Sequence, residues 1–125
     1  MKDMKRDERL LIVEDNPLIA AAIEKAGERH HLHADVATDG WDAIEKLRNE
    51  DYAAIVIDAD LPRHSGYGVL TYLRQENGDR LANVILMTSS DQESIREHEG
   101  LAVIARTEVI DDISAAFTIA YEPAE

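Results

Sequence analysis

A short apolar run that stops at an acidic residue constrains the fold of this chain more than any other feature. Residues 53–57, AAIVI, fit a strand, and a continuous run of this kind is typical of a parallel strand buried on both faces of a sheet. The run ends at Asp58, and Pro62 and Gly66 mark the loop that follows. Ligands of open α/β sheets bind beyond the carboxyl ends of the strands, where this carboxylate would lie. An acid that only ends the strand is the simpler alternative.

A second apolar run ends in acids as well. Residues 10–13, LLIV, are followed by Glu14 and Asp15, and then by Asn16 and Pro17, an N-cap and first-turn pair that predicts a helix start. If the two strands are neighbours, Glu14, Asp15 and Asp58 converge. Two carboxylates about 4 Å apart repel by roughly 4 kcal/mol at an effective dielectric near 20, so the group needs a cation or a proton. Oxygen ligands of this kind suit Mg²⁺.

The remaining hydrophobic pattern alternates between strand and helix. Strands are expected at about 9–13, 33–37, 53–57, 84–87 and 101–105, and helices at about 17–29, 40–49, 65–75, 90–99 and 108–121. Asp39 is expected to cap the second helix. Five strands alternating with five helices predict a parallel sheet with helices on both faces.

The first two helices carry apolar side chains at helical spacing. These are expected to face the core: Leu18, Ile19, Ala22, Ile23 and Ala26 in the first helix, and Trp41, Ile44 and Leu47 in the second.

Length, charge and composition bound the function. A chain of 125 residues predicts one domain, residues 1–125, with its core at about 9–121. A net charge of −13 argues against nucleic acid and anionic membrane surfaces as partners. The chain has no cysteine, no apolar run long enough to span a bilayer and no signal-peptide pattern, so a cytoplasmic protein is expected.

Four motifs, read in order, resemble a known family. They are LLIVEDNP, ATDGWDAI, IVIDADLPRHSG and VILMTSS, within a likeness that covers about residues 9–121. The chain resembles the CheY-like receiver domain of two-component response regulators. The resemblance implies a flavodoxin-like sheet with strand order 2-1-3-4-5.

The resemblance also implies roles for individual residues. Asp58 would accept a phosphoryl group from a histidine kinase's phosphohistidine or a small phosphodonor. Asp15, Asp58 and the backbone carbonyl of Asp60 would ligate Mg²⁺, with Glu14 acting through a water, and Thr88 would hydrogen-bond the phosphoryl group and report it. Carboxylate nucleophiles and donors aimed at phosphoryl oxygens are chemically suited to these tasks. Without the resemblance, Thr88 serves equally well as a helix-entry residue.

The partners and activity implied are those of a signalling module. A sensor histidine kinase or a phosphotransfer protein would supply the phosphoryl group, and an unidentified downstream protein would bind the changed surface. The chain would be a monomer or weak dimer. It would not be an enzyme beyond catalysing its own phosphorylation.

The region after the fifth strand departs from the family. The family has a Lys-Pro pair there, but this chain has Arg106 and Thr107, and its last lysine is Lys46. Arg106 is the candidate replacement, although a guanidinium is a planar fork rather than a compact ammonium. Val103 stands where the family often has an aromatic residue, and the segment 88–100 is short.

These departures keep other functions open. One alternative is a degenerate receiver that binds partners without phosphorylation. Asp58-Ala59-Asp60 also matches the DxD motif of haloacid-dehalogenase-type phosphatases, but it lies mid-chain with no room for a cap and no downstream lysine. An FMN carrier is disfavoured because Glu14 and Asp15 would repel its phosphate.

Overall fold

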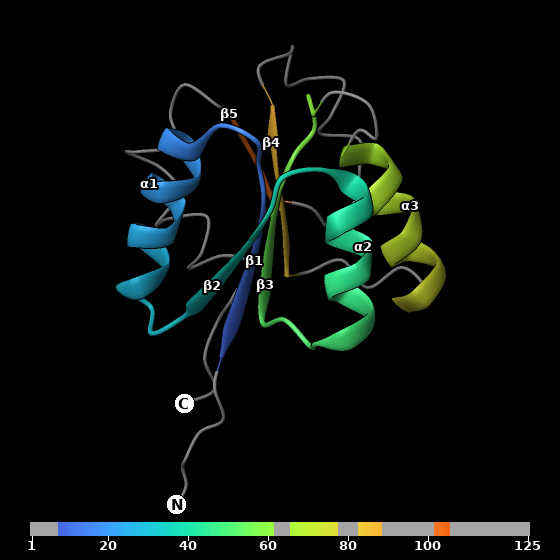
Figure 1. Cartoon of the computed structure of the whole chain (residues 1–125), viewed down its shortest axis with the longest axis horizontal. Coiled ribbons are helices and arrows are strands. Elements are labelled where there is room, and N and C mark those ends of the chain that lie inside the picture. Colours follow the sequence, from blue (N-terminus) through green and yellow to red (C-terminus); the bar gives the residue numbers. More distant parts are fainter. Residues whose placement is uncertain (1–7, 62–65, 78–82, 89–101, 106–125) are drawn as a thin grey trace, which may run out of the picture.

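The described chain alternates strands and helices around one parallel sheet. The computed structural model describes residues 8–61, 66–77, 83–88 and 102–105. Its elements are β1 (Arg9–Val13), α1 (Pro17–Glu28), β2 (His33–Ala37), α2 (Gly40–Asn49), β3 (Ala54–Asp58), α3 (Gly66–Asn77), β4 (Val84–Thr88) and β5 (Ala102–Ala105). All strand pairs are parallel, in the order β2-β1-β3-β4-β5 (Figure 1). The predicted fold class is confirmed. The helices expected at 90–99 and 108–121 lie outside the described residues.

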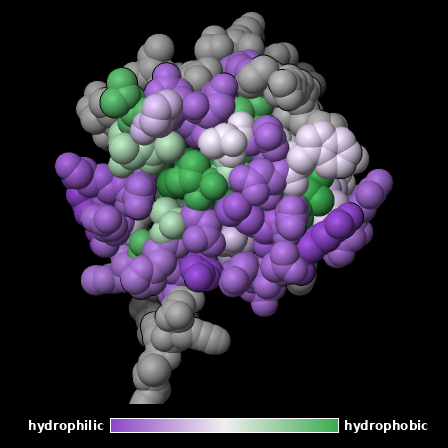
Figure 2. All heavy atoms as spheres, viewed as in Figure 1, coloured by the Kyte–Doolittle hydropathy of each residue, from purple (hydrophilic) through white to green (hydrophobic). Residues whose placement is uncertain are grey.

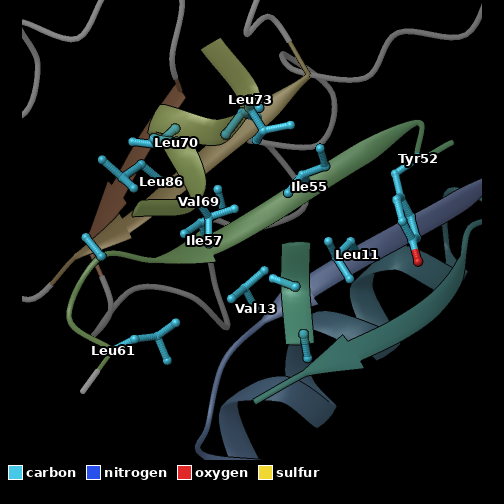
Figure 3. Packing of buried hydrophobic residues seen from close by; sticks show 14 residues of the cluster. Leu11, Val13, Tyr52, Ile55, Ile57, Leu61, Val69, Leu70, Leu73 and Leu86 are labelled. Atoms are coloured by element: carbon cyan, nitrogen blue, oxygen red, sulfur yellow. The ribbon is translucent and has the colours of Figure 1, made fainter. Parts of the chain in front are cut away.

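Helices cover both faces of the sheet. Figure 1 shows α1 on one side and α2 with α3 on the other. Alternate residues of β1 serve the two faces: Leu10 and Ile12 pack in the cluster that contains Ile23 and Ala26 of α1. Leu11 and Val13 pack in the cluster on the other face, which Figure 3 shows from close by. This two-residue period explains why the strands read as continuous apolar runs, since every side chain has a helix to pack against.

Two predicted core positions are wrong. Leu18 is 80% exposed, because the face of α1 that meets the sheet is centred on Ala20, Ile23 and Gly27, nearly opposite Leu18 at about 100° per residue. Trp41 is 68% exposed, because the small residue Gly40 occupies the buried position beside it.

Side-chain caps start both of the first two helices. Asn16 caps α1 and Pro17 occupies its first turn, as the sequence predicts. Asp39 caps α2 through its bond from the N–H of Asp42 at 2.8 Å. These caps begin each helix immediately after a strand, so the turns at the carboxyl edge of β1 and β2 are short and fixed.

The other end of α1 depends on a close approach to the sheet. A Cβ at Gly27 would lie 2.7 Å from Cδ2 of Leu10, so a larger residue at this position requires the Leu10 side chain or the helix to shift. The helix ends at Glu28, and in the turn that follows His31 adopts the left-handed region at φ 62°, while the N–H of Leu32 donates to the carbonyl of Gly27 at 3.0 Å. The chain then enters β2 directly.

Candidate functional site

Strand register brings the acidic residues to one edge of the sheet. Val13 of β1 pairs with Ile57 of β3, so the residues that follow them, Glu14 and Asp58, lie side by side. Asp58 is in turn level with Met87 of β4. The sheet therefore delivers its acids to the carboxyl ends of its central strands, as predicted from the two apolar runs.

Three carboxylates meet at this edge. One oxygen each from Glu14, Asp15 and Asp58 lie within 4.8 Å of one another. Glu14 is 1% exposed and Asp58 is fully buried, whereas Asp15 is exposed. We call these three residues the acid group. Two of its members are thus held inside the protein while the third opens to solvent.

Backbone amides orient the two buried carboxylates. The N–H of Asn16 donates to Oε2 of Glu14 at 2.9 Å, and the N–H of Asp60 donates to Oδ1 of Asp58 at 2.8 Å. The other oxygens, Oε1 of Glu14 and Oδ2 of Asp58, are also buried. Each carboxylate thus has one oxygen held by its own turn, which fixes its orientation, and a second oxygen inside the protein.

The strands on either side fix the backbone of these turns. The N–H of Glu14 donates to the carbonyl of Ala37 in β2 at 2.9 Å, and the N–H of Ala59 donates to the carbonyl of Met87 in β4 at 2.8 Å. Both turns are therefore extensions of the sheet ladder, which makes the acid group rigid at the level of the main chain.

The acid group has the donor chemistry of a magnesium site. Two like charges 4.8 Å apart repel by about 3 kcal/mol at an effective dielectric near 20, so the buried pair Glu14 and Asp58 favours a cation between them. All the donors are hard oxygens, which Mg²⁺ prefers, and the exposed Asp15 leaves a route for an ion that keeps some of its waters. The residues present fit the metal.

The structure positions some of the other predicted site residues. Asp60 follows Asp58 by two residues and its side chain is exposed. Thr88 ends β4, where its Cα pairs with that of Ala105. Arg106 lies outside the described residues.

Histidines are the other common metal ligands that this chain contains. The histidines at 30, 31 and 33 do not form a metal-binding group, because the acid group is the only cluster of three potential ligands among the residues with described positions. Arg63 and His64, which follow Asp58 in sequence, lie outside those residues.

A second polar cluster, which the sequence does not indicate, lies toward the amino ends of β1 and β3. The hydroxyl of Tyr52 donates to Oδ2 of Asp35 at 2.8 Å, and Arg9 lies between Asp35 at 3.7 Å and Glu50 at 3.3 Å. We call Arg9, Asp35, Glu50 and Tyr52 the tyrosine cluster. Burial and the bond to Asp35 raise the pKa of Tyr52 well above its ordinary value. The cluster borders a hollow of about 440 Å³ beside α2. Its members are separated by up to 43 positions in sequence, so no local motif could have revealed it.

Comparison with known proteins identifies the family of this chain. A family model for the response regulator receiver domain matches residues 10–113, which include all three acids. The chain belongs to the response regulator receiver family. The sequence resemblance is therefore confirmed, together with the two-component, CheY-like character that it implies.

Curated relatives of this receiver are longer proteins. The transcriptional regulatory protein CutR of Streptomyces coelicolor is 34% identical over 95 residues, which are 76% of this chain and 42% of CutR. The chain thus spans less than half the length of this relative. Such relatives are response regulators named as transcriptional regulators rather than enzymes. The expectation that nucleic acid is not a partner concerns the residues of this chain and stays a prediction.

Solved receiver structures share the fold over nearly the whole chain. The receiver domain of the Francisella response regulator 1452 has a TM-score of 0.75 at 25% identity and covers 93% of this chain and 98% of its own. The response regulator TrrA of Thermotoga maritima, in complex with Mg(2+)-BeF, has a TM-score of 0.71 at 21% identity. The match covers 90% of this chain and 98% of the TrrA chain. None of the helices in the described part of this receiver is long and apolar enough for a membrane crossing.

Proposed function

We propose that this receiver accepts a phosphoryl group on Asp58 in a Mg²⁺-dependent reaction and signals through altered protein binding, with residues 9–121 acting as one domain. The donor would be the phosphohistidine of a sensor kinase or phosphotransfer protein, or a small phosphodonor. The observation that carries the proposal is the convergence of Glu14, Asp15 and Asp58, because buried like charges at strand ends lower stability unless they serve a ligand.

The reaction uses Asp58 as the nucleophile. A carboxylate oxygen forms a bond to phosphorus while the phosphorus–nitrogen bond of phosphohistidine breaks, and the imidazole leaves with the electron pair and takes a proton from solvent. The bond from the N–H of Asp60 fixes the rotation of the Asp58 carboxylate, so its second oxygen is presented in one direction.

The remaining residues hold charge and orient groups. Asp15, Asp58 and the carbonyl of Asp60 would hold Mg²⁺, with Glu14 acting through a water. The ion would neutralise the acid group and the charge on the phosphoryl oxygens. Thr88 would donate a hydrogen bond to the phosphoryl group. The Mg(2+)-BeF complex of TrrA supports this assignment by analogy of fold.

Mass spectrometry of the intact chain tests the proposal directly. After incubation with acetyl phosphate and Mg²⁺, the chain should gain the mass of one phosphoryl group, and EDTA should prevent the gain. Asp58→Asn should abolish it. Asp60→Asn is the matched control, since it keeps the backbone carbonyl and should still gain the group. A gain that persists in Asp58→Asn, or no gain in the unaltered chain, contradicts the proposal.

One sequence observation favours a second candidate. Arg106-Thr107 replaces the Lys-Pro pair of the family, which would slow phosphorylation or shorten the lifetime of the phosphoryl group unless Arg106 substitutes for the lysine. The second candidate is a receiver that binds its partner without phosphorylation. Titration with beryllofluoride and Mg²⁺ separates the two, because a saturable change that disappears in Asp58→Asn supports only the phosphoacceptor.

A further inference from the structure

We infer that Asn16 is a positioning residue for the acid group. Its side chain fixes the turn between β1 and α1 in the conformation in which its own backbone N–H orients the carboxylate of Glu14. The inference rests on the proposed function, because it concerns how tightly the acid group binds a divalent cation. Figure 1 shows the turn at the upper edge of the sheet, where β1 leads into α1.

The side chain, the carbonyl and the N–H of Asn16 together connect α1 to the acid group. Oδ1 of Asn16 accepts the N–H groups of Leu18 at 2.9 Å and Ile19 at 3.4 Å. The carbonyl of Asn16 accepts the N–H of Ala20 at 2.9 Å. The N–H of Asn16 donates in the opposite direction, to Oε2 of Glu14 at 2.9 Å. The side chain and carbonyl of Asn16 thus anchor it to α1, and the remaining backbone group contacts a buried carboxylate.

The direction of that N–H depends on the cap. Asn16 has an extended backbone, with φ −92° and ψ 114°, as an N-cap residue requires, and its side chain is exposed and contacts the helix rather than the acids. Without the side-chain acceptor, the first turn of α1 frays more readily and the N–H of Asn16 samples other directions. Glu14 is then ordered in only a fraction of molecules, and the apparent affinity for a cation falls to that fraction of its original value.

The neighbouring helix supplies a matched control. Asp39 caps α2 at the same edge of the sheet, through bonds to Asp42 and Ala43 of its own helix. Loss of the Asp39 side chain therefore removes a cap of the same type without removing the link to Glu14. The change also removes one negative charge at this edge of the sheet. If that loss has any effect, it weakens cation binding, so it can only make the control resemble Asn16→Ala and cannot favour the inference.

Calorimetric titration of the full chain with Mg²⁺ tests the inference. The dissociation constant of Mg²⁺ should rise about three- to tenfold in Asn16→Ala, at or below the lower end of what outer contacts contribute to metal sites. Asn16→Gly should weaken binding in the same direction but less, and it guards against loss of folding, since glycine at an N-cap costs much less stability than alanine. Asn16→Ser, whose hydroxyl can cap the helix, should bind Mg²⁺ like the unaltered chain, and so should Asp39→Ala.

The outcomes distinguish this inference from the proposed function. If the unaltered chain does not bind Mg²⁺, the proposed function fails and the role of Asn16 fails with it. If the unaltered chain binds Mg²⁺ and both Asn16→Ala and Asn16→Gly bind equally well, only the positioning role is wrong. Weaker binding in Asp39→Ala, equal to that in Asn16→Ala, would likewise overturn it, because any lost cap would then produce the effect.

Discussion

The acid group and the tyrosine cluster place carboxylates on the same sheet in opposite ways. In the tyrosine cluster, Asp35 is partly exposed and has both a phenol and a guanidinium beside it. In the acid group, Glu14 and Asp58 are more deeply buried, and an oxygen of each lies within 4.8 Å of a carboxylate oxygen of the other and of Asp15. The first arrangement stabilises the fold. The second concentrates negative charge, and the proposed function assigns a cation to offset it.

The difference shows where this receiver places chemistry and where it places structure. The tyrosine cluster connects the start of β1, the middle of β2 and the segment before β3, and the amide of Asn83 adds a bond to the carbonyl of Tyr52 at 3.2 Å. It thus joins strands far from the acids. The face seen in Figure 2 is largely hydrophilic around a small apolar patch near its centre, in keeping with the net charge of −13.

The largest expected effect comes from removing a charge in the acid group. Asp58→Asn should raise the free energy of unfolding in EDTA by about 2 kcal/mol, because it removes the repulsion between two buried carboxylates. Urea denaturation measures this. Asp35→Asn, the equivalent change in the tyrosine cluster, should lower the free energy of unfolding. If Asp58→Asn and Asp35→Asn changed the free energy of unfolding in the same direction, the two clusters would not differ in their effect on stability.

The bond from Tyr52 to Asp35 should give the next largest effect. Tyr52→Phe should lower the free energy of unfolding by about 1.5 kcal/mol, since it removes a hydrogen bond to a charged group without opening a cavity. Mg²⁺ binding should not change. A variant as stable as the unaltered chain would contradict a stabilising role for the cluster.

The same residue predicts a dependence on alkaline pH. Because the pKa of Tyr52 is raised in the fold, its contribution to stability is complete below pH of about 10, the ordinary tyrosine value, and is lost as the pH rises further. Tyr52→Phe should lack this loss. The comparison cancels other alkaline titrations, such as that of Lys46, whose pKa is raised by its bond to Asp42.

Magnesium should act on one cluster alone. At a free concentration about tenfold above its dissociation constant, Mg²⁺ should raise the free energy of unfolding by about 1.4 kcal/mol. The increase should disappear in Asp58→Asn and persist in Tyr52→Phe. Thermal unfolding with and without EDTA measures it, and an equal increase in Asp58→Asn would place the metal elsewhere.

The smallest effect is expected at Arg9. Its two ion pairs are partly exposed, so Arg9→Gln should lower the free energy of unfolding by about 0.5 kcal/mol and the loss should shrink in salt. Denaturation at low and high ionic strength measures both. A large, salt-independent loss would mean that Arg9, rather than Tyr52, holds the cluster together.

Local patterns were enough to predict much of the fold. The apolar runs at 10–13 and 53–57 became β1 and β3, and both predicted caps, Asn16 and Asp39, were confirmed. The exposure of Leu18 and Trp41 was not predicted, because helical spacing shows that apolar residues recur but not which side of the helix meets the sheet.

The site shows the same division. The sequence predicts that Asp58 follows one strand and that Glu14 and Asp15 follow another. Their convergence can be inferred once the strands are known to be neighbours. The link from Asn16 to Glu14 was not predicted, although a cap residue next to an acid is a signal that could have indicated it.

The sequence by itself determined the strands, the helix starts and the acids at the strand ends, because these depend on residues adjacent along the chain. Only the tertiary structure decided which carboxylates are buried, which amides orient them and how Tyr52 reaches Asp35. Those properties depend on strand register and on the distance between side chains from different elements, and such distances are set by packing of the whole sheet rather than by any local pattern.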